Sequence, residues 1–162
     1  MTQSLEAAPS SAQVNKVRAA VRSFRQRHPE LRDSPTVAAI RRAMRREGIG
    51  FMWVPWPPNY RGMAAELLKK KWLSLNRDMT HPLEKRYVML HELGHFMLGH
   101  TVRSGPYAEA RRAEFGAPQR PLHDAAELEA ELFAELLGAP PCDSSGVSVN
   151  AVGLGNPKDV KR

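Results

Sequence analysis

The chain has 162 residues, of which 42% are hydrophobic and 25% are charged. That length is typical of one domain with its own core, and the composition is ordinary for a globular protein. No stretch approaches the roughly 18 consecutive apolar residues of a membrane-spanning helix, and residues 1–16 lack the apolar segment of a secretory signal. The single cysteine, Cys142, allows no intrachain disulfide and no cysteine-rich metal site. We therefore expect a cytoplasmic protein.

The net charge of +7 is concentrated toward the N-terminus. Residues 1–50 carry ten Lys or Arg against four Asp or Glu (+6), residues 51–100 seven against four (+3), and residues 101–162 seven against nine (−2). Excess positive charge attracts nucleic acid or an acidic partner protein. The simpler interpretation is a solvated, arginine-rich helix face, and nucleic-acid binding is kept as the alternative.

Two amphipathic helices are predicted in the first third of the chain. Between residues 11 and 27, apolar side chains recur at steps of three or four, and His28 with the proline after it ends the helix. Ser34 is the expected N-cap of a second helix with Pro35 in its first position, and Gly48 is expected to end it.

Short strands follow. Residues 49–54 are apolar and favour a strand, which the proline-rich segment 55–58 interrupts. Further strands are predicted at residues 60–64 and 71–76. The last of these precedes the motif described below, so we expect it to hold an extended substrate by adding it to the sheet.

Two more helices complete the pattern. One begins at Pro82 and continues through residue 97, and the other spans residues 122–137 and ends at Gly138. The segment 101–121 between them is predicted as a loop. Because the strands are not interleaved with the helices, the order predicts an α+β fold with one small, mostly antiparallel sheet.

The domain organisation is expected to be simple. We predict a disordered N-terminus over residues 1–10, one folded domain over residues 11–140, and a flexible tail over residues 141–162. We find no internal repeat.

A metal-binding pattern lies within the helix that begins at Pro82. Residues four apart lie on one face of a helix, so His91 and His95 can direct two imidazoles at one zinc ion. Glu92 is positioned to take a proton from a metal-bound water without being a ligand. Gly94 lacks a side chain where a second element must pack closely. The alternative is a surface helix with two solvated histidines, but the apolar neighbours Leu90, Leu93, Phe96, Met97 and Leu98 favour partial burial.

The third ligand must come from elsewhere. His100 does not fit the spacing of the HExxHxxGxxH pattern, because Leu98 and Thr101 occupy the positions that require Gly and His. We therefore expect His100 to be a helix C-terminal cap or a group that contacts a ligand from outside.

The last helix supplies the better candidate. Its stripe of Ala126, Ala130 and Ala134 permits close helix packing, and Glu127 projects from the side of that stripe. Glu131, one turn later, is expected to hydrogen-bond the outer nitrogen of a liganding histidine. His123 either stabilises an oxyanion or caps the first turn. Glu129 and Glu135 are expected to point away, and an ordinary acidic helix face is the alternative for all these glutamates.

The segments RYVMLHELGHFMLGH and ELEAELFAELLGAP together resemble the ImmA/IrrE family of bacterial metallo-endopeptidases. The typical second helix of that family, E-x-x-A-N-x-F-A-x-x-L-L-x-P, is matched here by Glu127, Ala130, Phe133, Ala134, Leu137 and Pro140. The resemblance covers roughly residues 35–140. One departure is Glu131, which stands where the family usually has Asn or Asp.

The resemblance implies a minimal zincin-like fold in which His91, His95 and Glu127 hold zinc and Glu92 is the catalytic base. It further implies a protein substrate, often a helix-turn-helix transcriptional repressor. The alternative function is a zinc-containing regulator without peptidase activity, which acts by binding DNA or a transcription factor through its basic N-terminal helices.

Overall fold

The structure is a computed structural model, and it describes residues 8–33, 35–58, 60–100, 103–104 and 121–139. Over these residues the chain has an α+β fold, as the order of elements predicted, and it consists of four α-helices and a small mixed sheet. The elements are α1 (Ser11–Arg27), the short 3-10 helix η1 (Pro29–Leu31), α2 (Val37–Arg46), β1 (Ile49–Val54), β2 (Gly62–Leu67), β3 (Lys70–Asn76), α3 (Pro82–Met97), β4 (Arg103–Ser104) and α5 (Pro121–Gly138).

The N-terminal helices form where their periodicity predicts them, but the start of α2 is different. Ser10 caps α1 in a reciprocal capping box with Gln13. The N-cap of α2 is Thr36 and not Ser34, because the Thr36 hydroxyl accepts the N–H of Ala39 from extended backbone. Gly48 follows the helix with a positive φ of 71°, as expected of a terminating glycine.

The sheet has the order β1-β3-β2-β4, and the prediction of a mostly antiparallel sheet is wrong. Strand β3 pairs antiparallel with β2 but parallel with β1, and β2 pairs parallel with the two residues of β4. The parallel pairing of β1 with β3 results from the path of the connection after β1. This connection carries the chain beyond the position of β3, so that the β2–β3 hairpin returns β3 between β1 and β2. Strand β2 also begins two residues later than predicted.

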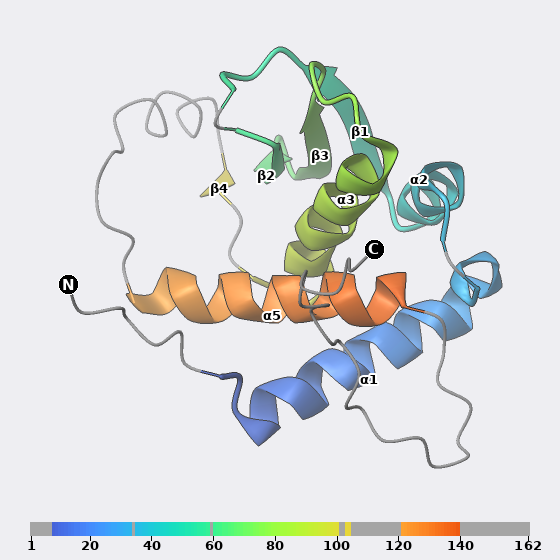
Figure 1. Ribbon diagram of the computed structural model, residues 1–162, viewed down its shortest axis with the longest axis vertical. Helices are drawn as coiled ribbons and strands as arrows, with labels where there is room; N and C mark the ends of the chain where they lie inside the picture. The colour runs from blue at the N-terminus through green and yellow to red at the C-terminus, as the bar shows by residue number, and fades with distance from the viewer. Residues whose placement is uncertain (1–7, 34, 59, 101–102, 105–120, 140–162) are drawn as a thin grey trace, which may run out of the picture.

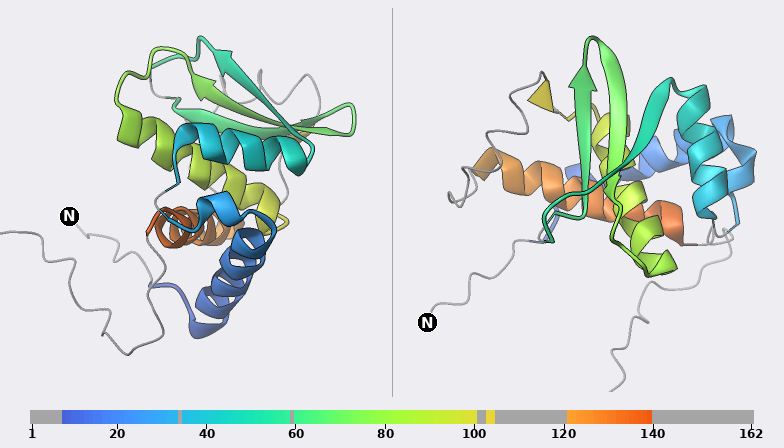
Figure 2. Two further views of the ribbon diagram at one scale, coloured as in Figure 1. Left: turned by 90° about the vertical axis from the view of Figure 1, so that its right-hand side faces the viewer. Right: turned by 90° about the horizontal axis from the view of Figure 1, so that it is seen from above.

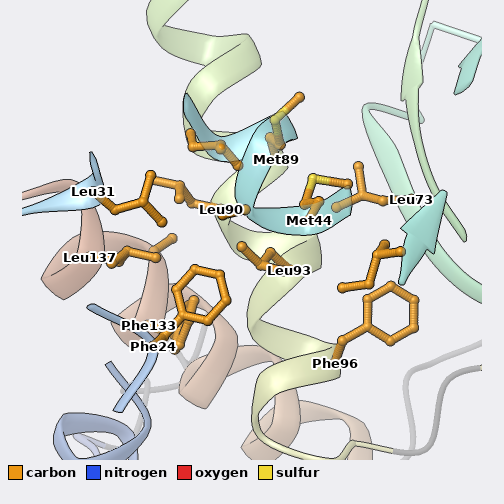
Figure 3. Packing of buried hydrophobic residues seen from close by; sticks show 14 of the residues in the cluster. Phe24, Leu31, Met44, Leu73, Met89, Leu90, Leu93, Phe96, Phe133 and Leu137 are labelled. Carbon is orange, nitrogen blue, oxygen red and sulfur yellow. The ribbon is translucent and has the colours of Figure 1, made fainter. Parts of the chain in front are cut away.

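Helix α3 lies at the centre of the molecule (Figures 1 and 2). The sheet and α2 pack against it on one side, and α5 packs against it on the other, with α1 against α5. Its side chains Leu90 and Leu93 are fully enclosed, and Figure 3 shows them between Phe133 of α5 and Leu73 of β3. Because α3 is covered on several faces, its apolar residues are not confined to one stripe.

The C-terminal end of α5 is held by arginines from two other helices. The Arg25 guanidinium of α1 donates to the carbonyl oxygens of Leu136 and Leu137 at 2.9 and 3.3 Å, and also to that of Ala139. Arg86 of α3 donates to the Gly138 carbonyl at 3.3 Å. The last carbonyls of a helix lack intrahelical partners and carry partial negative charge. These contacts therefore fix α5 relative to both α1 and α3.

Some sequence predictions fall on parts of the chain that the structure describes incompletely. The predicted tail, residues 141–162, and most of the predicted loop, residues 101–121, lie outside the described residues, as do residues 1–7 of the predicted disordered N-terminus. Within the described residues, no helix combines the length and the apolar character that crossing a membrane demands.

We expect Arg25→Met to lower the free energy of unfolding by about 1.5–3 kcal/mol, the usual value for hydrogen bonds to a charged group. Arg22→Met, which removes an exposed arginine of the same helix, is the matched control and should change stability by less than about 0.5 kcal/mol. Urea unfolding followed by circular dichroism measures both. Equal losses in the two variants would show that the cap does not hold α5.

Candidate metal centre

Helices α3 and α5 approach each other closely because small residues line their crossing. A Cβ atom added at Gly94 would lie 3.1 Å from the Phe133 ring and 3.3 Å from the Cα atom of Ala130. Ala130 and Ala134 are themselves buried. The structure thus confirms that Gly94 and the alanine stripe permit close packing, and this packing brings the histidine face of α3 opposite Glu127.

Three side chains meet at this crossing and form a set of potential metal ligands: His91, His95 and Glu127. The Nε2 atoms of the two histidines are 3.3 Å apart, and the carboxylate oxygens of Glu127 lie 3.0 Å from His91 Nε2 and 3.5 Å from His95 Nε2. Ligand atoms bound about 2.0–2.1 Å from a tetrahedral zinc ion lie roughly 3.3 Å from one another. The spacing and the N,N,O chemistry of the donors therefore fit a zinc ion.

The electrostatics of the group follow from its burial and its charges. Burial disfavours the charged form of Glu127, but the two imidazoles beside it, that of His91 first, outweigh burial and hold the pKa of Glu127 far below its usual range. Burial also opposes protonation of His91, yet the contact with Glu127 and the nearby carboxylate charges raise the pKa of His91. Without a cation between them, the carboxylate therefore favours the protonated form of the His91 imidazole.

Glu92 lies beside the three ligands and is positioned by strand β2. Its Oε2 atom accepts the backbone N–H of Ala64 at 2.7 Å. The strand can come so close because Gly62 has no side chain: a Cβ there would lie 2.6 Å from Val88 and 3.1 Å from Cγ of Glu92. The carboxylate expected to act as a base is thus held against a strand rather than extended into solvent.

The outer nitrogen of His95 has a partner that comes from just beyond the end of α3. Gly99 has a positive φ of 68°, and hydrogen bonds from Gly99 N–H to the Phe96 carbonyl and from His100 N–H to the His95 carbonyl form a Schellman motif. This turn places His100 Nδ1 3.0 Å from His95 Nδ1. His100 Nε2 lies 2.8 Å from Glu129, which also forms a 2.6 Å ion pair with Lys16 of α1.

Two of the remaining candidates, Glu131 and Glu129, are placed differently from the sequence expectation. Glu131 is exposed, and its charge contributes to raising the pKa of His91 while no hydrogen bond to a histidine is found for it among the described residues. His123 lies in the first turn of α5, where the side chains are outside the described part. The expectation that Glu129 points away is wrong, because it is buried against His100.

Glu129 and Lys16 were therefore missed. A helical projection of α5 alone cannot locate them, since their contact with the site depends on the chain after α3 turning back. The Leu98-Gly99-His100 sequence was the available signal, because a glycine directly after a helix favours this turn.

The expected role of β3 in substrate binding is not possible in this sheet. From Lys71 to Asn76, β3 is paired with β1 at one edge and, up to Leu75, with β2 at the other. A strand bordered on both sides has no free backbone groups for an added peptide. The strand that contacts Glu92 is β2.

We expect Gly94→Val to separate α3 from α5, with a cost of about 1–3 kcal/mol in stability from overpacking and at least about a tenfold loss of zinc affinity. Ala19→Val at an exposed position of α1 is the control and should cost below about 0.7 kcal/mol. Chemical unfolding and competition with a chromophoric chelator give the two quantities. Wild-type zinc affinity in Gly94→Val would contradict the geometric argument.

A pH dependence is expected for the metal-free protein. The lowered pKa of Glu127 stabilises the fold above the ordinary carboxyl pKa of about 4.3 and ceases to do so as pH falls through the folded value. The raised pKa of His91 stabilises it below the ordinary pKa of about 6.5 and ceases to do so as pH rises through the folded value.

The stability difference between wild type and Glu127→Gln, measured in chelator, should therefore be largest between about pH 4.5 and 6.5 and should shrink as pH rises through the raised pKa of His91. Zinc affinity, in contrast, should increase as pH rises above about 6, since the ion must displace the proton of His91. Urea unfolding across this range is the measurement. A difference independent of pH would show that the pair is not coupled.

The chain was compared with models of protein families, with curated proteins and with solved structures, and none of the three comparisons found a match.

Proposed function

We propose that the chain is a zinc-dependent endopeptidase of the ImmA/IrrE family, with a minimal zincin-like fold, acting in the cytoplasm. The observation that carries the proposal is the meeting of two imidazoles and one carboxylate at spacings that suit zinc, with a second carboxylate beside them. Three protein ligands leave one tetrahedral position for water or substrate, as in catalytic rather than structural zinc sites.

His91, His95 and Glu127 would hold the ion. When bound, zinc would act as a Lewis acid that polarises a peptide carbonyl, and it would lower the pKa of a bound water to about 7. Glu92 takes the proton of the attacking water and delivers it to the leaving amine. The hydrogen bond from Ala64 N–H keeps the Glu92 carboxylate oriented.

A protein substrate suits a site that adjoins a strand edge. Among the described residues, β4 pairs only with Ala65 and Glu66, so the first half of β2 has no strand partner on that edge. We place an extended segment of the substrate there, with its scissile bond next to Glu92. The family resemblance suggests a helix-turn-helix repressor as the natural substrate.

The alternative, a regulator that binds DNA through its basic helices, is less well supported. Four arginines of α1 and α2 already make contacts within the protein: Arg25 caps α5, Arg27 pairs with Glu47, Arg46 pairs with Glu30, and Arg41 stacks on Phe51. Charges engaged in this way contribute less to attraction of phosphates than their number suggests.

The direct test is cleavage of a proteome-derived peptide library, read by mass spectrometry, by the full chain loaded with zinc. Replacing the base in Glu92→Gln should slow cleavage by about 10²–10⁴-fold and leave zinc content unchanged. Glu135→Gln, the same change at an exposed position of α5, is the control and should retain wild-type activity.

Absence of zinc-dependent cleavage by the wild type, or full activity of Glu92→Gln, would contradict the peptidase proposal. A biological effect that survives in Glu92→Gln would favour the binding alternative. DNA binding itself would then appear as a steep loss of affinity with added salt.

A further inference from the structure

We propose that His100, Glu129 and Lys16 are positioning residues of the metal centre, and that they select the tautomer of His95 whose Nε2 atom can bind the ion. This inference rests on the proposed zinc site and extends it from α3 and α5 to α1. It assigns a role to three side chains that are not metal ligands.

The contacts form one continuous row. It runs from His95 Nδ1 to His100 Nδ1 at 3.0 Å, from His100 Nε2 to Glu129 Oε2 at 2.8 Å, and from that same oxygen to Lys16 Nζ at 2.6 Å. The side chains of His100 and Glu129 are only 9% and 10% exposed, whereas that of Lys16 is 49% exposed. The row thus leads from the ligand through the interior to the surface.

The direction of the hydrogen bonds is set at the Glu129 end. A carboxylate has no proton to donate, so His100 Nε2 must carry the proton of the 2.8 Å contact. In neutral His100 the other nitrogen, Nδ1, is then an acceptor. His95 must therefore donate from its own Nδ1, which leaves the lone pair of His95 Nε2 available toward His91 and Glu127.

The opposite arrangement is disfavoured. If His95 carried its proton on Nε2, its Nδ1 would be an acceptor and His100 would have to donate from Nδ1. The unprotonated Nε2 of His100 would then face the carboxylate of Glu129, with two acceptors 2.8 Å apart in a buried place. That His95 tautomer also cannot bind a metal through Nε2.

Lys16 completes the row by holding the Glu129 carboxylate. Its ammonium donates to the same oxygen that accepts from His100, which keeps that oxygen ionised and directed at the imidazole. Since Lys16 belongs to α1, the N-terminal helix contributes to the centre although it provides no ligand.

The experiment measures zinc affinity of the full chain by competition with a chromophoric chelator. Glu129→Gln preserves shape but can pair with either tautomer of His100, and we expect it to weaken zinc binding by about 10–100-fold. Lys16→Met should weaken it less, by under about tenfold. The matched controls are Glu135→Gln and Arg18→Met, which remove one negative charge from α5 and one positive charge from α1 at exposed positions. Both should bind zinc as the wild type does.

A second measurement separates positioning from a general loss of structure. Long-range ¹H–¹⁵N correlation spectra of the metal-free protein near pH 8 report which nitrogen of each histidine carries the proton. We expect His95 in the Nδ1–H form in the wild type and a mixture of both forms in Glu129→Gln, with far-ultraviolet circular dichroism unchanged. A variant that merely unfolds would lose the dichroism signal instead.

The outcomes distinguish this inference from the proposed function. If the wild type binds no zinc, the proposed function fails. If the wild type binds zinc but Glu129→Gln binds it equally well, or if His95 of the wild type carries its proton on Nε2, the positioning role is overturned while the zinc site stands.

Discussion

The close crossing of α3 and α5 shapes both the core of the molecule and its candidate metal site. It requires Gly94 on one helix and Ala130 on the other, because a side chain at Gly94 would meet the Phe133 ring and the α5 backbone. Only at this separation does the Glu127 carboxylate reach the two imidazoles. The arginine cap at the end of α5 and the sheet behind α3 both preserve the crossing, so the core and the candidate site share one set of contacts.

The parts of the molecule that depend on one helix at a time were predictable from sequence. The i, i+4 spacing places His91 and His95 on one face of α3, and the alanine stripe indicates the side of α5 that packs inward, which together identify Glu127. Helix ends marked by Gly48, Pro82 and Gly138 were also found. In each case the information lies within a few residues along the chain.

Features that depend on how distant segments meet were not predictable. The parallel pairing of β1 with β3 follows from the path of a connection whose direction no local pattern records. The burial of Glu129 depends on Gly99 reversing the chain so that His100 returns beside His95, and the hydrogen bond from Ala64 to Glu92 depends on Gly62 letting β2 approach. Such contacts are set by tertiary packing, which overrides the direction expected from one helix.

We propose that this crossing holds one zinc ion between two imidazoles and a carboxylate. X-ray absorption at the zinc edge, combined with elemental analysis of the full chain, tests it most directly. We expect one zinc per chain, bound by two imidazole nitrogens and by oxygen ligands, and we expect this environment to be lost in His91→Ala. A wild-type protein without stoichiometric metal, or a zinc environment unchanged by His91→Ala, would contradict it.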